Sequence, residues 1–229
     1  MSIKVNKNTI KCAVFDLDGT LLNTLKTINY YLNTTLERHS LSPIPEGKCR
    51  EFVGDGAVKL ISRALDYLGV KDEGIFKSVF DDYNCVYDAD PYYLTEHYEG
   101  VKELLLAMKK EGIVLAVLSN KPDFATRAAV NHFFPNTFDA AFGAREGIAL
   151  KPDPRALLSM LESLSVTPEQ VAYIGDSEPD VLTGKNAGVA LPISVTWGFR
   201  TKSQLLSVGA SIFAHSPDEI LSIIKTDAK

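Results

Sequence analysis

Residues 12–20 have the sequence CAVFDLDGT, in which an apolar run from Ala13 to Phe15 ends at Asp16. Asp18 follows two positions later, and a Gly-Thr pair closes the stretch. Ligands of open α/β sheets bind at the carboxyl ends of strands, so we expect a site at Asp16 and Asp18. Two carboxylates this close repel each other unless a cation lies beside them, and Mg²⁺ prefers such oxygen ligands. Taken alone, the stretch is equally compatible with a solvated turn.

Five further apolar runs have the length of strands, at residues 113–118, 138–142, 171–174, 191–195 and 211–214. Helical patterns lie between them at residues 101–108, 156–164 and 220–224, and Thr167-Pro168 has the pattern of a helix start. Apolar runs without polar alternation are typical of strands that are covered on both faces. The chain is therefore predicted to be an α/β protein with a Rossmann-like open parallel sheet.

One long segment interrupts this alternation of strands and helices. Residues 23–90 contain helical stripes, at 25–36, 57–68 and 75–87, but no strand candidate. We expect an inserted α-helical cap domain at residues 23–90. The core domain would then consist of residues 1–22 and 91–229.

Polar residues also follow two other predicted strands. Ser119 and Asn120 come directly after the run 113–118, and Asp176 and Asp180 follow the run 171–174. Lys151 lies in a loop that two prolines stiffen. Each group alone could be a helix cap or a surface turn. Together, acids that hold a cation and a serine and a lysine that hold an anion indicate a phosphoryl-transfer site.

These groups, in this order, resemble the four motifs of the haloacid-dehalogenase-like (HAD) superfamily. The matching stretches are FDLDGT at 15–20, LSNK at 118–121, KPDP at 151–154 and GDSEPD at 175–180. The helical insertion after the first motif resembles the small helical cap of that family. The resemblance extends from about Lys11 to about Ile224.

The resemblance implies a role for each motif residue. Asp16 would be the nucleophile that forms an aspartyl-phosphate, and Asp18 the general acid and then the general base. The phosphoryl oxygens would be bound by Ser119, Asn120 and Lys151. The cofactor Mg²⁺ would be held by the Asp16 carboxylate, the Asp18 backbone carbonyl and the Asp176 carboxylate. Asp180 would support these groups by orienting the ligands or Lys151.

Within the superfamily, the phosphoglycolate phosphatase branch is the most similar, on weaker cues at residues 52–56, 98–101 and 197–199. The resemblance implies a phosphatase for a small phosphomonoester, with 2-phosphoglycolate as the first candidate. Asp18 argues against the dehalogenases, which attack carbon. A mutase similar to β-phosphoglucomutase, a pyrophosphatase and a catalytically silent binding protein remain as alternatives.

We expect residues of the cap domain to determine which substrate is bound. The loop Gly54-Asp55-Gly56 is expected to face Asp16 when the cap closes, since its glycines allow backbone to approach a ligand. A cation near this loop would meet the carboxylate of phosphoglycolate, and the candidates are Arg50, Lys59 and Arg63. Any one of the three could instead be a solvated surface residue.

Composition narrows the choice of partners. The 229 residues carry a net charge of −5, which gives no overall attraction to nucleic acid or to anionic membranes. Three widely spaced cysteines indicate free thiols in a reducing cytosol rather than disulfides or a zinc site. The N-terminal residues lack the apolar stretch of a signal peptide. We expect a cytoplasmic monomer or homodimer whose partner is a small phosphorylated metabolite.

Overall fold

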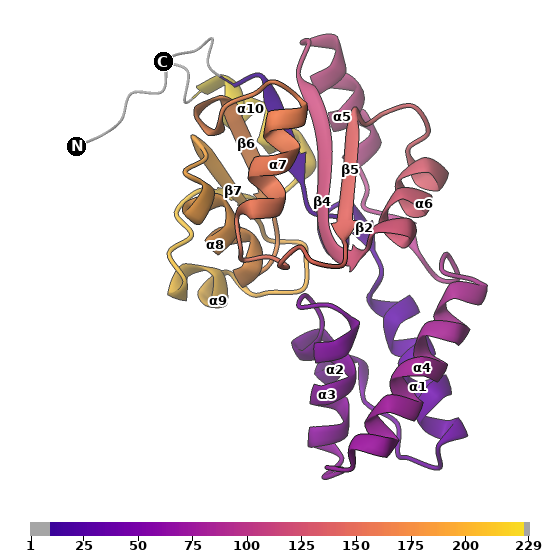
Figure 1. The fold of residues 1–229 in the computed structure, drawn as a ribbon. Helices are drawn as coiled ribbons and strands as arrows, with labels where there is room; N and C mark the ends of the chain where they lie inside the picture. Colours follow the sequence, from indigo (N-terminus) through magenta and orange to yellow (C-terminus); the bar gives the residue numbers. More distant parts are fainter. Residues whose placement is uncertain (1–9, 227–229) are drawn as a thin grey trace.

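The computed structural model describes residues 10–226, and a parallel sheet lies at the centre of the upper group of elements in Figure 1. The strands are β1 (Cys12–Phe15), β4 (Val114–Pro122), β5 (Ala140–Ala144), β6 (Val171–Gly175), β7 (Leu191–Val195) and β8 (Phe213–Ala214). They lie in the order β5-β4-β1-β6-β7-β8, and all of them run parallel. The predicted α/β class with an open parallel sheet is confirmed.

Helices cover both faces of this sheet. They are α5 (Val101–Lys110), α6 (Asp123–Phe133), α7 (Arg155–Ser163), α8 (Glu178–Ala187) and α10 (Pro217–Thr226), and the short helix α9 (Lys202–Ser207) packs beside α8. Alternate residues of β1 point to opposite faces, as expected for a strand. Phe15 belongs to a hydrophobic cluster with α5, α6 and α10, whereas Val14 belongs to a cluster with α7 and α8.

The register brings the ends of three strands together. Phe15 of β1 pairs with Val117 of β4 and with Ile174 of β6. The residues that follow these positions therefore meet at one edge of the sheet. In Figure 1 this edge faces the second group of helices.

That second group is formed by α1 (Leu25–Arg38), α2 (Glu46–Phe52), α3 (Ala57–Tyr67) and α4 (Glu73–Ala89). These helices share a hydrophobic cluster of their own, in which Leu32, Leu36 and Ile61 are fully buried. A short antiparallel ribbon, β2 (Leu22–Asn23) with β3 (Glu96–His97), joins the two chain passages between this group and the sheet.

The structure differs from the sequence-based expectations in detail. Thr167-Pro168 begins only a three-residue 3-10 helix, η1 (Pro168–Gln170), because β6 starts at the next residue. Strand β4 continues to Pro122, four residues beyond the apolar run. Helices α2, α6 and α9 and the β2–β3 ribbon were not predicted.

Within residues 10–226, no helix is both long enough and apolar enough to cross a lipid bilayer. The prediction that the chain has no signal peptide depends on residues 1–9, which lie outside the described residues.

Candidate active site

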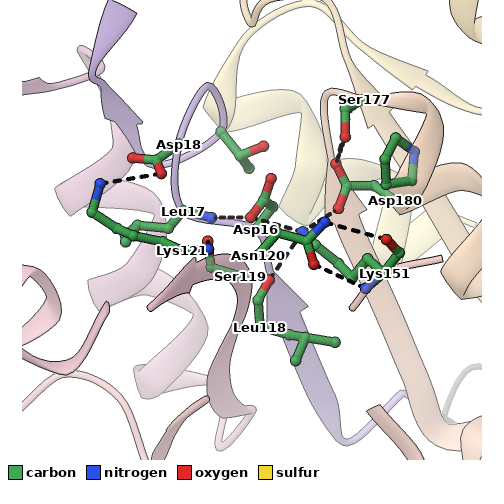
Figure 2. A network of polar contacts seen from close by, with 12 residues as sticks. Asp16, Leu17, Asp18, Leu118, Ser119, Asn120, Lys121, Lys151, Ser177 and Asp180 are labelled. Atoms are coloured by element: carbon green, nitrogen blue, oxygen red, sulfur yellow. Dashed lines mark hydrogen bonds and ion pairs between the residues drawn. The ribbon is translucent and has the colours of Figure 1, made fainter. Parts of the chain in front are cut away.

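Asp16 lies at the carboxyl end of β1, and its carboxylate is held by two donors (Figure 2). The Leu17 backbone N–H donates to Asp16 Oδ1 at 2.7 Å, and Lys151 Nζ lies 2.8 Å from the same oxygen. Asp16 is 7% exposed and Lys151 is 4% exposed, so this ion pair is almost completely buried. No hydrogen bond from the described residues occupies Asp16 Oδ2. Asp16 therefore has one fixed oxygen and one oxygen free to react.

Asp180, near the start of α8, holds Lys151 from the other side. Its Oδ1 accepts from Lys151 Nζ at 2.7 Å and from Tyr173 Oη at 3.2 Å. Its Oδ2 accepts from the backbone N–H of Ser177 at 3.1 Å and also from the Ser177 hydroxyl. Four donors thus occupy this carboxylate, which suits it to orienting Lys151 rather than to binding a ligand.

Asp176, which follows β6, is fully buried. Its Oδ1 accepts from the Thr20 hydroxyl at 3.0 Å, and its Oδ2 accepts from the Phe199 backbone N–H at 2.7 Å. A Cβ atom at either Gly19 or Gly198 would collide with the Asp176 carboxylate. Gly19 also has φ of +87°, a conformation that favours glycine. These two glycines make room for the carboxylate, so its position depends on both.

Three buried carboxylates surround one buried ammonium in this site. Burial, the Asp180 carboxylate and, to a smaller extent, Asp176 raise the pKa of Asp16 well above its usual range, although Lys151 opposes them. Burial and Asp180 raise the pKa of Asp176 to about 7. Burial lowers the pKa of Lys151, but Asp16 and Asp180 outweigh it and raise the pKa above its usual value. The group has an excess of negative charge that a bound cation would offset.

The same carboxylates fit a hard divalent cation. Asp16, Asp176 and Asp180 each offer an oxygen, and these ligand atoms all lie within 4.8 Å of one another. The set is formed only by oxygen ligands, which suit Mg²⁺ better than Zn²⁺. Because Asp180 already accepts four hydrogen bonds, Asp16 and Asp176 are the better candidates for direct ligands.

Asn120, near the end of β4, connects two loops at this edge of the sheet. Its Oδ1 accepts from the Lys151 backbone N–H at 2.8 Å, and its Nδ2 donates to the carbonyls of Lys151 and Gly54, each at 3.2 Å. Ser119 Oγ accepts from the Lys121 backbone N–H at 3.2 Å. Ser119 is 5% exposed, and its hydroxyl lies among the groups around Asp16 in Figure 2. Asn120 therefore fixes the backbone that carries Lys151 and also contacts the loop at Gly54.

Asp18 lies two residues beyond Asp16 and is less buried. Lys121 Nζ lies 3.4 Å from its Oδ2, whereas its Oδ1 is buried without a hydrogen-bond partner among the described residues. The Lys121 side chain is only 9% exposed. Lys121 belongs to the motif at 118–121, but the family resemblance implied no role for it.

The loop between α2 and α3 lies against this edge of the sheet. Gly54 contacts the Asn120 side chain, and a Cβ at Gly56 would lie 3.4 Å from the Asn120 carbonyl. Arg200, which was not singled out from the sequence, donates to the carbonyls of Arg50 at 2.8 Å and Val53 at 2.6 Å. Its Nε also donates to Glu178 at 2.7 Å.

The three cations proposed for substrate recognition lie elsewhere. Arg63 forms an ion pair with Asp55 at 2.5 Å and donates to the Phe52 carbonyl, so it orders the loop. The residues Arg50 and Lys59 are exposed. A cavity of about 40 Å³ remains at the site. It is lined by Asp16, Asp18, Ile28, Val53, Gly54, Gly56, Ser119, Asn120, Lys121 and Phe199, and these residues include none of the three.

Comparison with known proteins places the chain in a family. Residues 13–192 match the model of the haloacid dehalogenase-like hydrolases. The chain belongs to this family, as the order of its motifs predicted.

Individual relatives agree with the predicted branch. A phosphoglycolate phosphatase of Haemophilus influenzae is 34% identical over 191 residues, which cover 81% of this chain and 85% of that protein. One from Rhodospirillum rubrum is 32% identical and covers 87% of this chain and 85% of its own. The solved structure of a predicted phosphoglycolate phosphatase from Haemophilus somnus superposes with a TM-score of 0.88 at 26% identity, covering 94% of this chain and 98% of the other. The predicted enzyme class, a phosphoric monoester hydrolase, is confirmed.

Proposed function

We propose that this protein is a Mg²⁺-dependent phosphatase that hydrolyses a small phosphomonoester, with 2-phosphoglycolate as the favoured substrate. The observation that carries the proposal is the buried Asp16–Lys151 pair, at 2.8 Å, beside Asp18 and the Asp176 carboxylate. The names of the relatives support the choice of substrate. The role of each site residue belongs to the proposal.

The first half-reaction forms an aspartyl-phosphate. An Asp16 carboxylate oxygen attacks phosphorus as the bond from phosphorus to the ester oxygen breaks. Asp18 donates its proton to the departing oxygen, so the product leaves as an alcohol. Lys151 and the Ser119 hydroxyl stabilise the negative charge of the phosphoryl oxygens. Because Asp180 and Asn120 fix Lys151 from two sides, this stabilisation needs no rearrangement.

The second half-reaction restores the enzyme. Asp18, now deprotonated, accepts a proton from water as the water oxygen attacks phosphorus. The bond between phosphorus and Asp16 breaks, and inorganic phosphate is released. The Asp16 and Asp176 carboxylates, with the Asp18 backbone carbonyl, would hold Mg²⁺, which supplies positive charge to the phosphoryl group when bound.

Residues 23–90 are proposed to act as a cap domain that closes over this chemistry. The cavity of about 40 Å³ is smaller than any of the candidate substrates, so the cap is proposed to open for substrate entry and to close again for the reaction. The choice of a phosphatase over a phosphosugar mutase therefore depends on the names of the relatives rather than on the cavity. The closed arrangement also excludes water while the aspartyl-phosphate forms.

A panel of phosphate esters tests the proposal. Purified protein with Mg²⁺ is expected to show its highest kcat/KM on 2-phosphoglycolate, compared with hexose phosphates, pyrophosphate and an aryl phosphate. EDTA should stop turnover and added Mg²⁺ should restore it, because the proposed mechanism needs the positive charge of Mg²⁺ beside the phosphoryl group. Full activity in EDTA, or a preference for pyrophosphate, would contradict the proposal.

A glycine variant tests the position of the cation. Gly198→Ala is expected to weaken Mg²⁺ binding about 10–100-fold, because the added Cβ displaces the Asp176 carboxylate. Binding of Mg²⁺ by calorimetry and the Mg²⁺ dependence of turnover would both report the change. Gly47→Ala is the matched control, since an added Cβ there has no atom within 4 Å. Unchanged Mg²⁺ affinity in Gly198→Ala would show that Asp176 is not a ligand.

A further inference from the structure

Lys121 is a buried cation that the mechanism above does not use. It lies near the end of β4, and its side chain is 9% exposed. Its Nζ donates to Tyr87 Oη at 2.6 Å and lies 3.4 Å from Asp18 Oδ2 (Figure 2 shows the Asp18 side). An ammonium group has three N–H donors, so one remains for a further acceptor. Lys121 is also among the residues that line the cavity.

Tyr87, on α4, adds a second donor beside Lys121. Because its oxygen accepts from Lys121, its own hydroxyl proton is free to point to another acceptor. Among the described residues, the Tyr87 hydroxyl donates no hydrogen bond. Lys121 and Tyr87 thus place a positive charge and a hydroxyl donor side by side, one from the sheet and one from the helical group.

The position of Lys121 and Tyr87 relative to Asp18 determines which part of the substrate these two side chains can contact. Asp18 protonates the ester oxygen of the leaving group, so that oxygen must lie within hydrogen-bonding distance of Asp18. Lys121 is 3.4 Å from the same carboxylate. A group on the carbon that is bonded to the ester oxygen would therefore lie close enough to contact the Lys121 ammonium.

Other cations near the site have no donor left or do not line the cavity. Lys151 Nζ contacts Asp16, Asp180 and the Leu118 carbonyl, and Arg200 is bound by Glu178 and by two backbone carbonyls. Within the described part of the chain, Lys121 is the one cationic residue among those that line the cavity.

We propose that Lys121, with Tyr87, binds a carboxylate on the carbon next to the ester oxygen of the substrate. The pair would select phosphoesters of 2-hydroxy acids against neutral esters of the same size. The inference rests on the proposed phosphatase function and names the group that recognises its substrate. It replaces Arg50, Lys59 and Arg63 as the recognition cation.

The test compares two substrates that differ in charge but hardly in size, 2-phosphoglycolate and 2-hydroxyethyl phosphate. In Lys121→Met, the ratio of kcat/KM for the first to that for the second is expected to fall about 10–100-fold, mainly through KM, as a charged hydrogen bond is lost. Tyr87→Phe should lower the same ratio about 3–10-fold, because it removes a neutral donor. Lys110→Met, which changes an exposed lysine, should keep the wild-type ratio.

The outcomes separate the inference from the proposed function. If the wild type prefers 2-phosphoglycolate but Lys121→Met and Tyr87→Phe slow both esters equally, the phosphatase stands and the recognition role is overturned. If the wild type does not favour the carboxylate ester at all, the proposed substrate fails and the recognition role fails with it. Tyr87→Phe keeps the test decisive if Lys121→Met does not fold.

Discussion

Asp16→Asn is expected to reduce kcat by about 10⁴-fold or more, because the amide cannot displace the ester oxygen and no other carboxylate occupies its place. The fold should persist. The change removes one of three crowded carboxylates, and Lys151 keeps its 2.7 Å contact with Asp180. Thermal unfolding of the metal-free variant should therefore occur at or above the wild-type temperature. Steady-state kinetics and circular dichroism provide the two measurements.

A direct search for the intermediate strengthens this test. Acid quenching during turnover, followed by mass spectrometry, should locate one phosphoryl group on the peptide that contains Asp16, and Asp16→Asn should lack it. Asp66→Asn, an exposed change on α3, should leave kcat unaltered. Substantial turnover by well-folded Asp16→Asn would mean that another residue attacks phosphorus.

Lys151→Met is expected to lower the free energy of unfolding by about 3–5 kcal/mol, since it leaves buried carboxylates without their counter-charge. The side chain is 2% exposed and lies 2.8 Å from Asp16 and 2.7 Å from Asp180. Turnover should also be lost, because the transferring phosphoryl group loses a cation. Denaturant unfolding in EDTA isolates the effect on stability from any effect of bound metal.

A surface lysine provides the comparison. Lys225 pairs with Glu111 at 2.7 Å, but the two side chains are 53% and 49% exposed, so Lys225→Met should cost less than about 1 kcal/mol. The double variant Asp16→Asn/Lys151→Met should regain part of the lost stability, as one unpaired carboxylate is removed. Equal costs for the two lysine variants would show that the buried network does not depend on Lys151.

The sequence was sufficient for the sheet and for the principal residues of the site because both depend on local pattern. Apolar runs mark the strands, and the carboxyl ends of adjacent parallel strands meet at one edge. Asp16, Ser119 and Asp176 therefore come together although 160 residues separate the first from the last. The order of the four motifs, through the family resemblance, added Lys151 to the candidate site, although it lies in a loop without any periodic signal.

Features that depend on contacts between distant segments could not be predicted in this way. Arg200 joins α8 to the backbone of α2 and its following loop, and no pattern near residue 200 shows these partners. The apolar run of β4 ends at Leu118, so the strand was predicted to end there. It continues through the polar residue Lys121 to Pro122. Helix α2 buries only Cys49, and a single buried residue leaves no stripe to recognise.

Phe199 has a consequence for exchanging parts between relatives. Its side chain, 5% exposed, belongs to the hydrophobic cluster of the α1–α4 helices, although its position in the chain follows β7. The interior of those helices is therefore completed by a residue from outside residues 23–90. A chimera that receives a foreign segment 23–90 would have to receive the matching residues 197–200 as well. An exchange of these helices between relatives thus involves two separate segments of the chain. A substitution in one segment limits which substitutions the other can accept.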